Sequence, residues 1–265
     1  MDIAALVSDY NRDGFVSGVP ILDRKEAAHH RKALEGAEQQ LGESLHYRFK
    51  AHTVLTSPYQ LAIKPDVLDI VEAMIGPDIL LYNVTYIIKE PHSPSHVSWH
   101  QDLTYWGLSH DDQVTMWLAL SVADEASGCM RMVPASHRAG RMDHDISQHD
   151  KNNVLLQSQT VHNVDETGAV LCPLQPGEAS FHHGWTLHAS MPNKSHDRRI
   201  GLNVQYLAAH VRQTKHDLDT AMLVRGKDDY RHFEPDIPAS ADLTPEGIAR
   251  QKMLEERYKQ IAGQA

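Results

Sequence analysis

Residues 97–106 read VSWHQDLTYW, and this stretch decides how the chain is interpreted. It is rich in aromatic and β-branched residues, which favour a β-strand. In a regular strand His100 and Asp102 point to the same face, so both side chains reach one metal ion. Two imidazoles and one carboxylate on one side of a metal leave adjacent positions open for other ligands. A site of this kind needs a second histidine elsewhere in the chain.

The His-x-Asp spacing is weak evidence alone, because the chain has 19 histidines in 265 residues. At this composition the pattern is expected about once or twice by chance. It occurs at His100/Asp102 and again at His110/Asp112. The second pair lies in polar sequence with turn composition, so we interpret it as part of a solvated loop.

The spacing from His188 to an arginine is rarer. Of the 19 histidines, only His188 has an arginine eleven residues later, at Arg199. A guanidinium group stays charged and forms two parallel hydrogen bonds with a carboxylate. Arg198 is the alternative candidate for this role. Neighbouring residues of a regular strand point to opposite faces, so only one of the two arginines can face the site, and the spacing favours Arg199.

His182 and His183 are rival metal ligands. One of them is expected to face the interior, where a hydrogen-bonded structural histidine is the alternative role. We prefer His188 because it is followed by both Ser190 and Arg199.

The composition excludes several classes of protein. The formal charge is −10, from 25 basic and 35 acidic side chains, so we expect no nucleic-acid or membrane partner. The sequence shows no basic-then-apolar leader and no apolar run of about 20 residues, which favours a cytoplasmic location. Cys129 and Cys172 are the only cysteines, and buried free thiols are favoured over a disulfide between them.

No linker or charge block divides the chain, so we expect one domain over residues 1–265. The part up to about residue 76 has apolar residues at helical spacing. A β-rich core is expected over about 79–210, and a tail with a helix over about 211–265. Helices are expected over residues 3–10, 23–41 and 65–75, and after residue 244.

Six short segments of the core are rich in β-branched and aromatic residues and are separated by turn residues. This pattern is typical of a sandwich or barrel that encloses a site, with the helices packed outside. The predicted fold is therefore mainly β with flanking helices, around a jelly-roll core. The expected strands are 79–90, 97–106, 114–122, 129–133, 179–183 and 199–208.

Alternation along these strands assigns their side chains to two faces. The residues expected to face the site are Asn83, Thr85, Ser98, His100, Asp102, Thr104, Thr115, Trp117, Arg199, Asn203 and Gln205. The residues expected to pack against the helices are Val84, Ile88, Met116, Leu118, Val204 and Tyr206. A bulge inverts part of such an assignment.

A long polar segment lies between residues 141 and 177. Connections of this length often cover an active site. A partly ordered surface loop is the alternative, and the sequence does not decide between a mobile lid and such a loop.

Four blocks follow one another along the chain: YNRDGF at 10–15, WHQDL at 99–103, GCMRMVPASH at 128–137, and HASMPN at 188–193 with Arg198-Arg199 after it. Together they resemble the phytanoyl-CoA dioxygenase family of Fe(II)/2-oxoglutarate oxygenases. The resemblance covers most of the chain. It implies a double-stranded β-helix, which is a distorted, cupin-like jelly roll.

The resemblance also implies roles for individual residues. It implies that His100, Asp102 and His188 bind Fe(II). Arg199 is then expected to pair with the distal carboxylate of 2-oxoglutarate, with support from Ser190. The further cosubstrate-binding positions that it implies are Trp117, Asn83, which matches a site-lining amide of a related ectoine hydroxylase, and Lys50, which matches only across a gap.

The activity implied is an Fe(II)- and 2-oxoglutarate-dependent dioxygenase that uses O2 to hydroxylate a C–H bond of a small molecule, with release of succinate and CO2. Asp102 occupies the position that related halogenases leave to chloride, so we expect no halogenation. One alternative is a non-catalytic or zinc-binding jelly-roll protein that binds a small molecule, because these ligands alone do not select iron over zinc. Another alternative is an acyl-CoA hydroxylase.

The candidate substrate residues are Thr104, Trp106 and Arg131. The modest length of the chain and the polar candidates Asn83, Thr104 and Arg131 favour a small polar or charged metabolite, such as an amino acid, a betaine- or ectoine-like compound, or one like 2-aminoethylphosphonate. A structural salt bridge is the alternative role of Arg131, and core packing is that of Trp106. The sequence leaves open whether the protein is a monomer or a homodimer.

Overall fold

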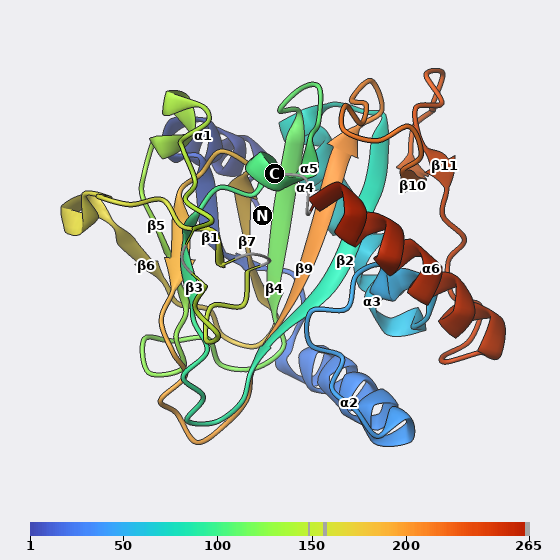
Figure 1. The fold of residues 1–265 in the computed structure, drawn as a ribbon, viewed down its shortest axis with the longest axis horizontal. Helices are drawn as coiled ribbons and strands as arrows, with labels where there is room; N and C mark the ends of the chain where they lie inside the picture. The colour runs from blue at the N-terminus through green and yellow to red at the C-terminus, as the bar shows by residue number, and fades with distance from the viewer. Residues whose placement is uncertain (148, 156–157, 263–265) are drawn as a thin grey trace.

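The computed structural model describes residues 1–147, 149–155 and 158–262. Two β-sheets form the centre of the molecule, with helices around them (Figure 1), as the sequence predicted. The larger sheet has the order β1-β7-β4-β9-β2-β10-β11, and the smaller one has the order β3-β8-β5-β6.

The strands are short except for β2 and β9. In the larger sheet they are β1 (Phe15–Pro20), β2 (Ile79–Lys89), β4 (Gln113–Ala119), β7 (Glu178–His183), β9 (Arg199–Ala208), β10 (Thr220–Arg225) and β11 (Glu234–Pro235). In the smaller sheet they are β3 (Val97–His100), β5 (Met130–Met132), β6 (Val170–Cys172) and β8 (His188–Ser190).

The predicted helices are confirmed, and their ends follow from local sequence. Asp23 caps α2 and forms a reciprocal capping box with Glu26, while Gly14 ends α1 at a φ of 83° that suits glycine. The helices are α1 (Ile3–Asp13), α2 (Arg24–Leu41), α3 (Thr56–Ala62), α4 (Pro65–Ile75), α5 (Leu103–Trp106) and α6 (Pro245–Ala262), with 3-10 turns at Ala51–Thr53, Ser136–Ala139 and Glu166–Gly168. Within the described ranges, no helix is long and apolar enough to cross a membrane.

The main hydrophobic core lies between the larger sheet and helices α1 to α4. Every strand residue that the sequence assigned to the helix-facing side belongs to this core, for example Val84, Met116 and Val204. Burial of these side chains away from water holds the helices on the sheet. The opposite face of the sheet is left for polar side chains.

Polar residues of the adjacent strands β2 and β9 lie side by side on this inner face of the sheet. The register pairs Asn83 with Gln205, Thr85 with Asn203, and Lys89 with Arg199. An irregularity between Leu81 and Asn83 shifts the alternation once, and beyond it the predicted facing of β2 is correct.

The prediction of one strand over residues 97–106 is wrong in its second half. Strand β3 ends at His100, opposite the residue where its antiparallel partner β8 begins, and Asp102 has the helical φ and ψ values −58° and −46°. The side chain of Gln101 bonds Gly140 O, Trp185 O and Met142 N, which anchors the chain as it leaves the sheet. His100 and Asp102 therefore converge across a strand-to-helix junction, not by strand alternation.

Strands β1, β6, β8, β10 and β11 were not predicted. The sequence of β1 contains Gly18 and Pro20, which are unusual in strands, and its pairing with β7 is irregular. Strands β6 and β8 have three residues each, too few for a period-two pattern to be visible.

Candidate active site

His100, Asp102 and His188 meet inside the molecule. His100 ends β3 and His188 begins β8, and the register pairs them directly. The Nε2 atoms of His100 and His188 lie 3.4 and 3.8 Å from Asp102 Oδ1. One ligand atom from each residue lies within 4.8 Å of the others, and all three residues are buried. This is the spacing of donor atoms around a single metal ion.

The hydrogen bonds of the two imidazoles leave their Nε2 atoms available to a metal. His188 Nδ1 lies 2.9 Å from Thr186 O, and His100 Nδ1 lies 2.9 Å from Ser98 O. A carbonyl oxygen only accepts, so each Nδ1 carries the proton and each Nε2 carries a lone pair. Such bonds fix the tautomer of metal-binding histidines. Two lone pairs and a carboxylate oxygen that face one another suit a shared cation.

Asp102 is anchored through its other oxygen. Oδ2 accepts a hydrogen bond from Thr115 Oγ1 at 3.1 Å, and His182 Nε2 lies 3.4 Å away. Burial alone would raise the pKa of Asp102, but the neighbouring His100 and His182 hold it well below its usual value. Burial lowers the pKa of His188, so this imidazole is neutral. These are the protonation states that metal ligands need.

Arg199 is buried, with 1% of its surface exposed, and opens β9 on the cavity side. Its Cζ lies 5.0 Å from the ring centre of Trp117, a cation–π contact. In the described ranges no carboxylate pairs with it, and its Nε has no hydrogen-bond partner. Burial lowers its pKa to about 10, so it remains charged at neutral pH. A buried, unpaired guanidinium is costly unless an anion joins it.

Ser190 and Lys89 accompany this guanidinium. Ser190 lines the same cavity, and Lys89 Nζ donates to Ser190 Oγ at 2.7 Å and to Met191 O at 2.5 Å. Lys89 is the register partner of Arg199. Burial, and then the charge of Arg199, lower the pKa of Lys89 to about 6. This corner of the cavity thus holds the Arg199 guanidinium and the Ser190 hydroxyl, with the Lys89 amine, largely neutral above pH 6, bonded to that hydroxyl.

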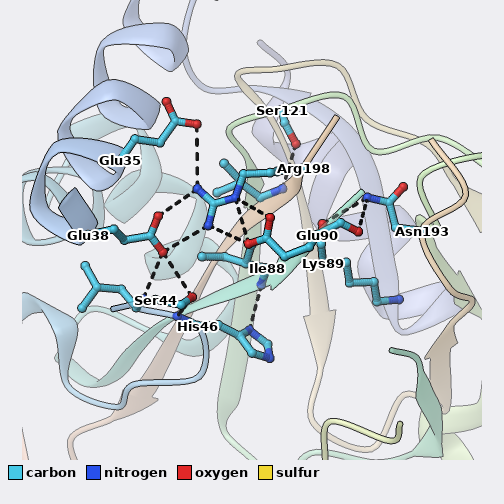
Figure 2. Close-up of polar contacts among 12 residues, drawn as sticks. Glu35, Glu38, Ser44, His46, Ile88, Lys89, Glu90, Ser121, Asn193 and Arg198 are labelled. Carbon is cyan, nitrogen blue, oxygen red and sulfur yellow. Dashed lines mark hydrogen bonds and ion pairs between the residues drawn. The ribbon is translucent and has the colours of Figure 1, made fainter. Parts of the chain in front are cut away.

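Arg198 points the other way, as predicted. It lies on the outer surface, where it forms ion pairs with Glu38 at 2.8 Å and with Glu90 at 2.9 Å. Figure 2 shows Arg198 among Glu35, Glu38 and Glu90, with the Lys89 side chain pointing away from them. Of the two adjacent arginines, only Arg199 reaches the cavity.

The cavity that contains the metal ligands opens to solvent, and its empty space, open solvent included, is about 850 Å³. Its floor is the inner face of β2, β4 and β9, and one wall is aromatic. The aromatic residues that line it are Tyr47, Phe49, Tyr105, Trp106, Trp117 and Tyr258. Residues 154, 155 and 159 of the long polar segment also line it, while residues 148, 156 and 157 lie outside the described ranges.

Asn83 and Lys50, which the resemblance implies as cosubstrate-binding residues, have different surroundings. Asn83 lines the cavity, where its Oδ1 accepts from Lys50 N and its Nδ2 donates to Thr85 Oγ1. The ammonium of Lys50 is directed elsewhere, to Tyr82 O, Thr220 O and Asp236. The cation near Arg199 is Lys89, a residue that the sequence analysis missed.

Of the three candidate substrate residues, Trp106 alone lines the cavity. Thr104 Oγ1 lies 3.4 Å from His144 Nδ1, away from the cavity lining. Arg131 forms an ion pair with Glu166 and lies over the ring of Trp99, which matches the structural alternative that the sequence left open.

The remaining histidine candidates have other surroundings. His182 lines the cavity beside Asp102 but is not among the converging ligand atoms, while His183 lies 3.9 Å from the exposed Asp111. His110 and Asp112 are exposed, as their turn-like sequence indicated. Cys129 and Cys172 are buried free thiols, as predicted.

Strand alternation was the signal that could have identified Lys89. It follows Asn83, Thr85 and Ile87 at every second position of β2, and these three residues line the cavity. A lysine on the inner face of a strand next to polar residues is unusual. By contrast, no local sequence pattern predicted that the segments containing Tyr47, Phe49 and Tyr258 would pack beside the sheet and line the cavity.

Comparison with known proteins agrees with the fold. Residues 10–201 match the family model "Phytanoyl-CoA dioxygenase (PhyH)". The chain is 31% identical over 144 residues to a probable alpha-ketoglutarate-dependent hypophosphite dioxygenase of Stutzerimonas stutzeri, covering 54% of this chain and 50% of that protein. It is 27% identical over 151 residues to the peroxisomal phytanoyl-CoA dioxygenase of Bos taurus, covering 55% and 44%.

The matched segment thus spans half or less of the length of these curated relatives. Among solved structures, the apo form of the non-heme monooxygenase ThoJ superposes with a TM-score of 0.82 at 27% identity, covering 96% of this chain and 99% of that one.

The fold and the converging ligands define a jelly-roll protein with a two-histidine, one-carboxylate metal site. The chain belongs to the phytanoyl-CoA dioxygenase (PhyH) family.

Proposed function

We propose that this protein is an Fe(II)- and 2-oxoglutarate-dependent dioxygenase that hydroxylates a C–H bond of a small organic molecule. The observation that carries the proposal is Arg199, a buried guanidinium without an anionic partner in the described ranges, in the same cavity as the converging ligands. A site that only holds a structural metal has no need of such a group. The names of the relatives support the same reaction class.

The ligand set fits a divalent metal through His100 Nε2, His188 Nε2 and Asp102 Oδ1. Bound iron, together with 2-oxoglutarate and O2, supplies the oxidising chemistry. Thr115 and His182 keep the carboxylate oriented through its other oxygen. Outer partners of this kind commonly account for a tenfold to hundredfold change in metal affinity or activity.

The cosubstrate fits the cationic corner of the cavity. Arg199 would bind the distal carboxylate bidentately, and Ser190 would donate a hydrogen bond to it. Lys89 donates to the oxygen of Ser190, which leaves the hydroxyl proton of Ser190 for the carboxylate. Trp117 holds the guanidinium plane from one side, and Asn83 lines the floor further along.

The substrate that we propose is a small molecule. The relatives named above include enzymes that act on hypophosphite and on phytanoyl-CoA. The expectation of a polar or charged metabolite depended on Asn83, Thr104 and Arg131. Asn83 lines the cavity, whereas Thr104 and Arg131 form their contacts outside the cavity lining. Within the described ranges, the lining offers a charged substrate no ion-pair partner beyond the proposed metal and cosubstrate sites.

The test is anaerobic reconstitution of the purified protein with Fe(II), followed by calorimetric titration with 2-oxoglutarate. We expect one iron per chain and metal-dependent 2-oxoglutarate binding, and then succinate formation after O2 is admitted. Metal-bound protein that does not bind 2-oxoglutarate would refute the proposal and favour the binding-protein alternative.

Substitution of a ligand gives a matched comparison. Asp102→Ala should lower iron affinity by roughly a hundredfold or more, because even outer-shell changes cost tenfold to a hundredfold. Asp112→Ala, in the exposed His110/Asp112 pair, should leave iron content unchanged. Equal iron loss in both variants, measured by metal analysis after dialysis, would mean that the wrong pair was assigned.

A further inference from the structure

The carboxylate, the guanidinium and the imidazoles that line the cavity all have roles in the proposed metal and cosubstrate sites. They are Asp102, Arg199, His100, His182 and His188. Lys89 is bonded to Ser190 and is not part of the lining, and the other described lining residues carry no carboxylate, amine, guanidinium or imidazole. A charged substrate would therefore lie beside the metal without a side-chain counter-ion of its own, which burial makes unfavourable.

One wall of the cavity is aromatic and is built from three separate segments. Tyr47 and Phe49 precede the first 3-10 turn, Tyr105 and Trp106 belong to α5, and Tyr258 comes from α6. The rings of Phe49 and Tyr258 lie 4.1 Å apart between centres. These side chains form a hydrophobic cluster separate from that around Trp117. Their faces suit a flat, apolar ring system.

Two residues that line the cavity, outside the proposed metal and cosubstrate sites, each carry a polar atom without a partner within the described ranges. These atoms are the hydroxyl of Tyr105 and the Oε1 of Gln205. Both residues line the cavity, and their exposed fractions are only 8% and 4%. Buried polar atoms in native proteins are nearly always hydrogen-bonded, so a ligand that reaches them gains from pairing. Tyr105 offers a donor and Gln205 an acceptor.

We propose that the substrate is an uncharged, ring-containing molecule that carries a neutral hydrogen-bonding group, such as an amide or a hydroxyl. Its ring lies against the aromatic wall, and its polar group pairs with Tyr105 and Gln205. This inference rests on the proposed function, since it concerns the space left beside the metal and 2-oxoglutarate.

The experiment uses three probes with one ring and different charges: 2-naphthamide, 2-naphthoate and 2-naphthylmethylammonium. The protein is loaded with Ni(II), which does not support turnover, and saturated with 2-oxoglutarate. Calorimetry then measures the affinity for each probe. We expect the neutral amide to bind at least about tenfold more tightly than either charged probe.

Two variants test the contacts. Tyr105→Phe and Gln205→Leu should each weaken 2-naphthamide binding by about tenfold, through loss of one hydrogen bond in a buried site. Arg131→Gln, which changes a cation outside the cavity lining, should leave it unchanged.

The outcomes separate this inference from the proposed function. Failure of 2-oxoglutarate to bind the Ni(II) protein counts against the proposed function itself. With 2-oxoglutarate bound, tighter binding of a charged probe, or no binding of any probe, overturns the inference about the substrate. Loss of probe affinity in Arg131→Gln but not in Tyr105→Phe would also overturn it.

Discussion

Arg199 holds a positive charge inside the protein without a carboxylate partner in the described ranges. In Arg199→Met, 2-oxoglutarate affinity should fall by about a hundredfold, because a desolvated charge pair commonly contributes about 2–5 kcal/mol. The same variant should unfold at a higher temperature when no 2-oxoglutarate is present, because an unpaired buried charge has been removed. Calorimetry and thermal unfolding, each with and without 2-oxoglutarate, measure both effects.

Arg198→Met is the matched control, since its ion pairs with Glu38 and Glu90 lie outside the cavity. It should lower stability through the loss of these partly buried pairs and leave 2-oxoglutarate affinity within about threefold. The opposite order of effects would show that the two arginines were assigned to the wrong faces.

Lys89 makes 2-oxoglutarate binding depend on pH. Its pKa of about 6 means that the side chain is largely neutral at pH 7.5. An anion bound beside it favours the ammonium form, so binding should take up close to one proton. Above pH 6 the affinity should therefore fall, by up to about tenfold per pH unit. Calorimetry in buffers with different ionisation enthalpies measures the proton uptake.

Lys89→Met should abolish that uptake, and the exposed Lys227→Met should retain it. The folded-state pKa of Lys89 lies below the ordinary value of 10.5, so the unfolded chain binds this proton more readily. Folding stability should therefore fall as the pH drops from about 10 to 6, and less so in Lys89→Met. Unchanged proton uptake in Lys89→Met would exclude Lys89 as its source.

At the scale of the element, β9 contributes two polar groups to the cavity lining, the guanidinium of Arg199 and the amide of Gln205. Gly201 lies between them, and a Cβ atom there would come 1.9 Å from Cζ2 of Trp117. Gly201→Ala should therefore displace the Trp117 ring that covers the guanidinium. We expect a loss of about 1–3 kcal/mol in the free energy of unfolding, together with weaker 2-oxoglutarate binding.

Gly36→Ala in α2 is the control, because no atom lies within 4 Å of the added Cβ. It should stabilise the protein by up to about 1 kcal/mol through helix propensity. Denaturant unfolding gives both free energies. Normal stability and normal 2-oxoglutarate affinity in Gly201→Ala would contradict the packing described for Trp117.

At the scale of the whole molecule, a buried ion pair joins the segment after Phe49 to the end of the last strand. Lys50 Nζ lies 3.0 Å from Asp236 Oδ2, and His52 Nε2 lies 3.3 Å from the same oxygen. Burial opposes ionisation of Asp236, but Lys50 and His52 hold its pKa well below the usual value. Its stabilising effect should thus be present above about pH 4 and lost as the pH falls further.

Asp236→Asn should lower the free energy of unfolding by about 3–5 kcal/mol at neutral pH, because it leaves the Lys50 ammonium buried and unpaired. The difference from the unsubstituted protein should narrow below about pH 4. Asp242→Asn, which changes an exposed acceptor of two hydrogen bonds from Thr56, should cost only about 1 kcal/mol. Denaturant titration measures the free energy of unfolding of both variants. A similar decrease in the two would argue against a stabilising role for the buried Lys50–Asp236 pair.

Short-range sequence signals were sufficient for much of this fold and site. Capping residues and apolar periodicity predicted α1, α2 and α4, because those signals act within a few turns of chain. The spacing from His188 to Arg199 separated one histidine from its 18 counterparts. It did so because His188 and Arg199 begin two strands that follow each other in sequence, β8 in the smaller sheet and β9 in the larger one.

Tertiary structure alone decided the conformation between His100 and Asp102 and the identity of the second cation. Strand β3 ends where its pairing with β8 stops, and the extent of that pairing is a long-range property that no local pattern encodes. The ammonium of Lys50 is bound by backbone carbonyls and Asp236 far along the chain, while Lys89 lies beside Ser190 through sheet register.

The sequence by itself determined the kind of chemistry, because metal ligands and a carboxylate-binding arginine are properties of residue type and spacing. The shape and charge of the substrate space were decided only by the tertiary structure. Its aromatic wall assembles from the segment at 47–49, α5 and α6, which lie far apart in sequence and meet only because burial of their rings brings them together.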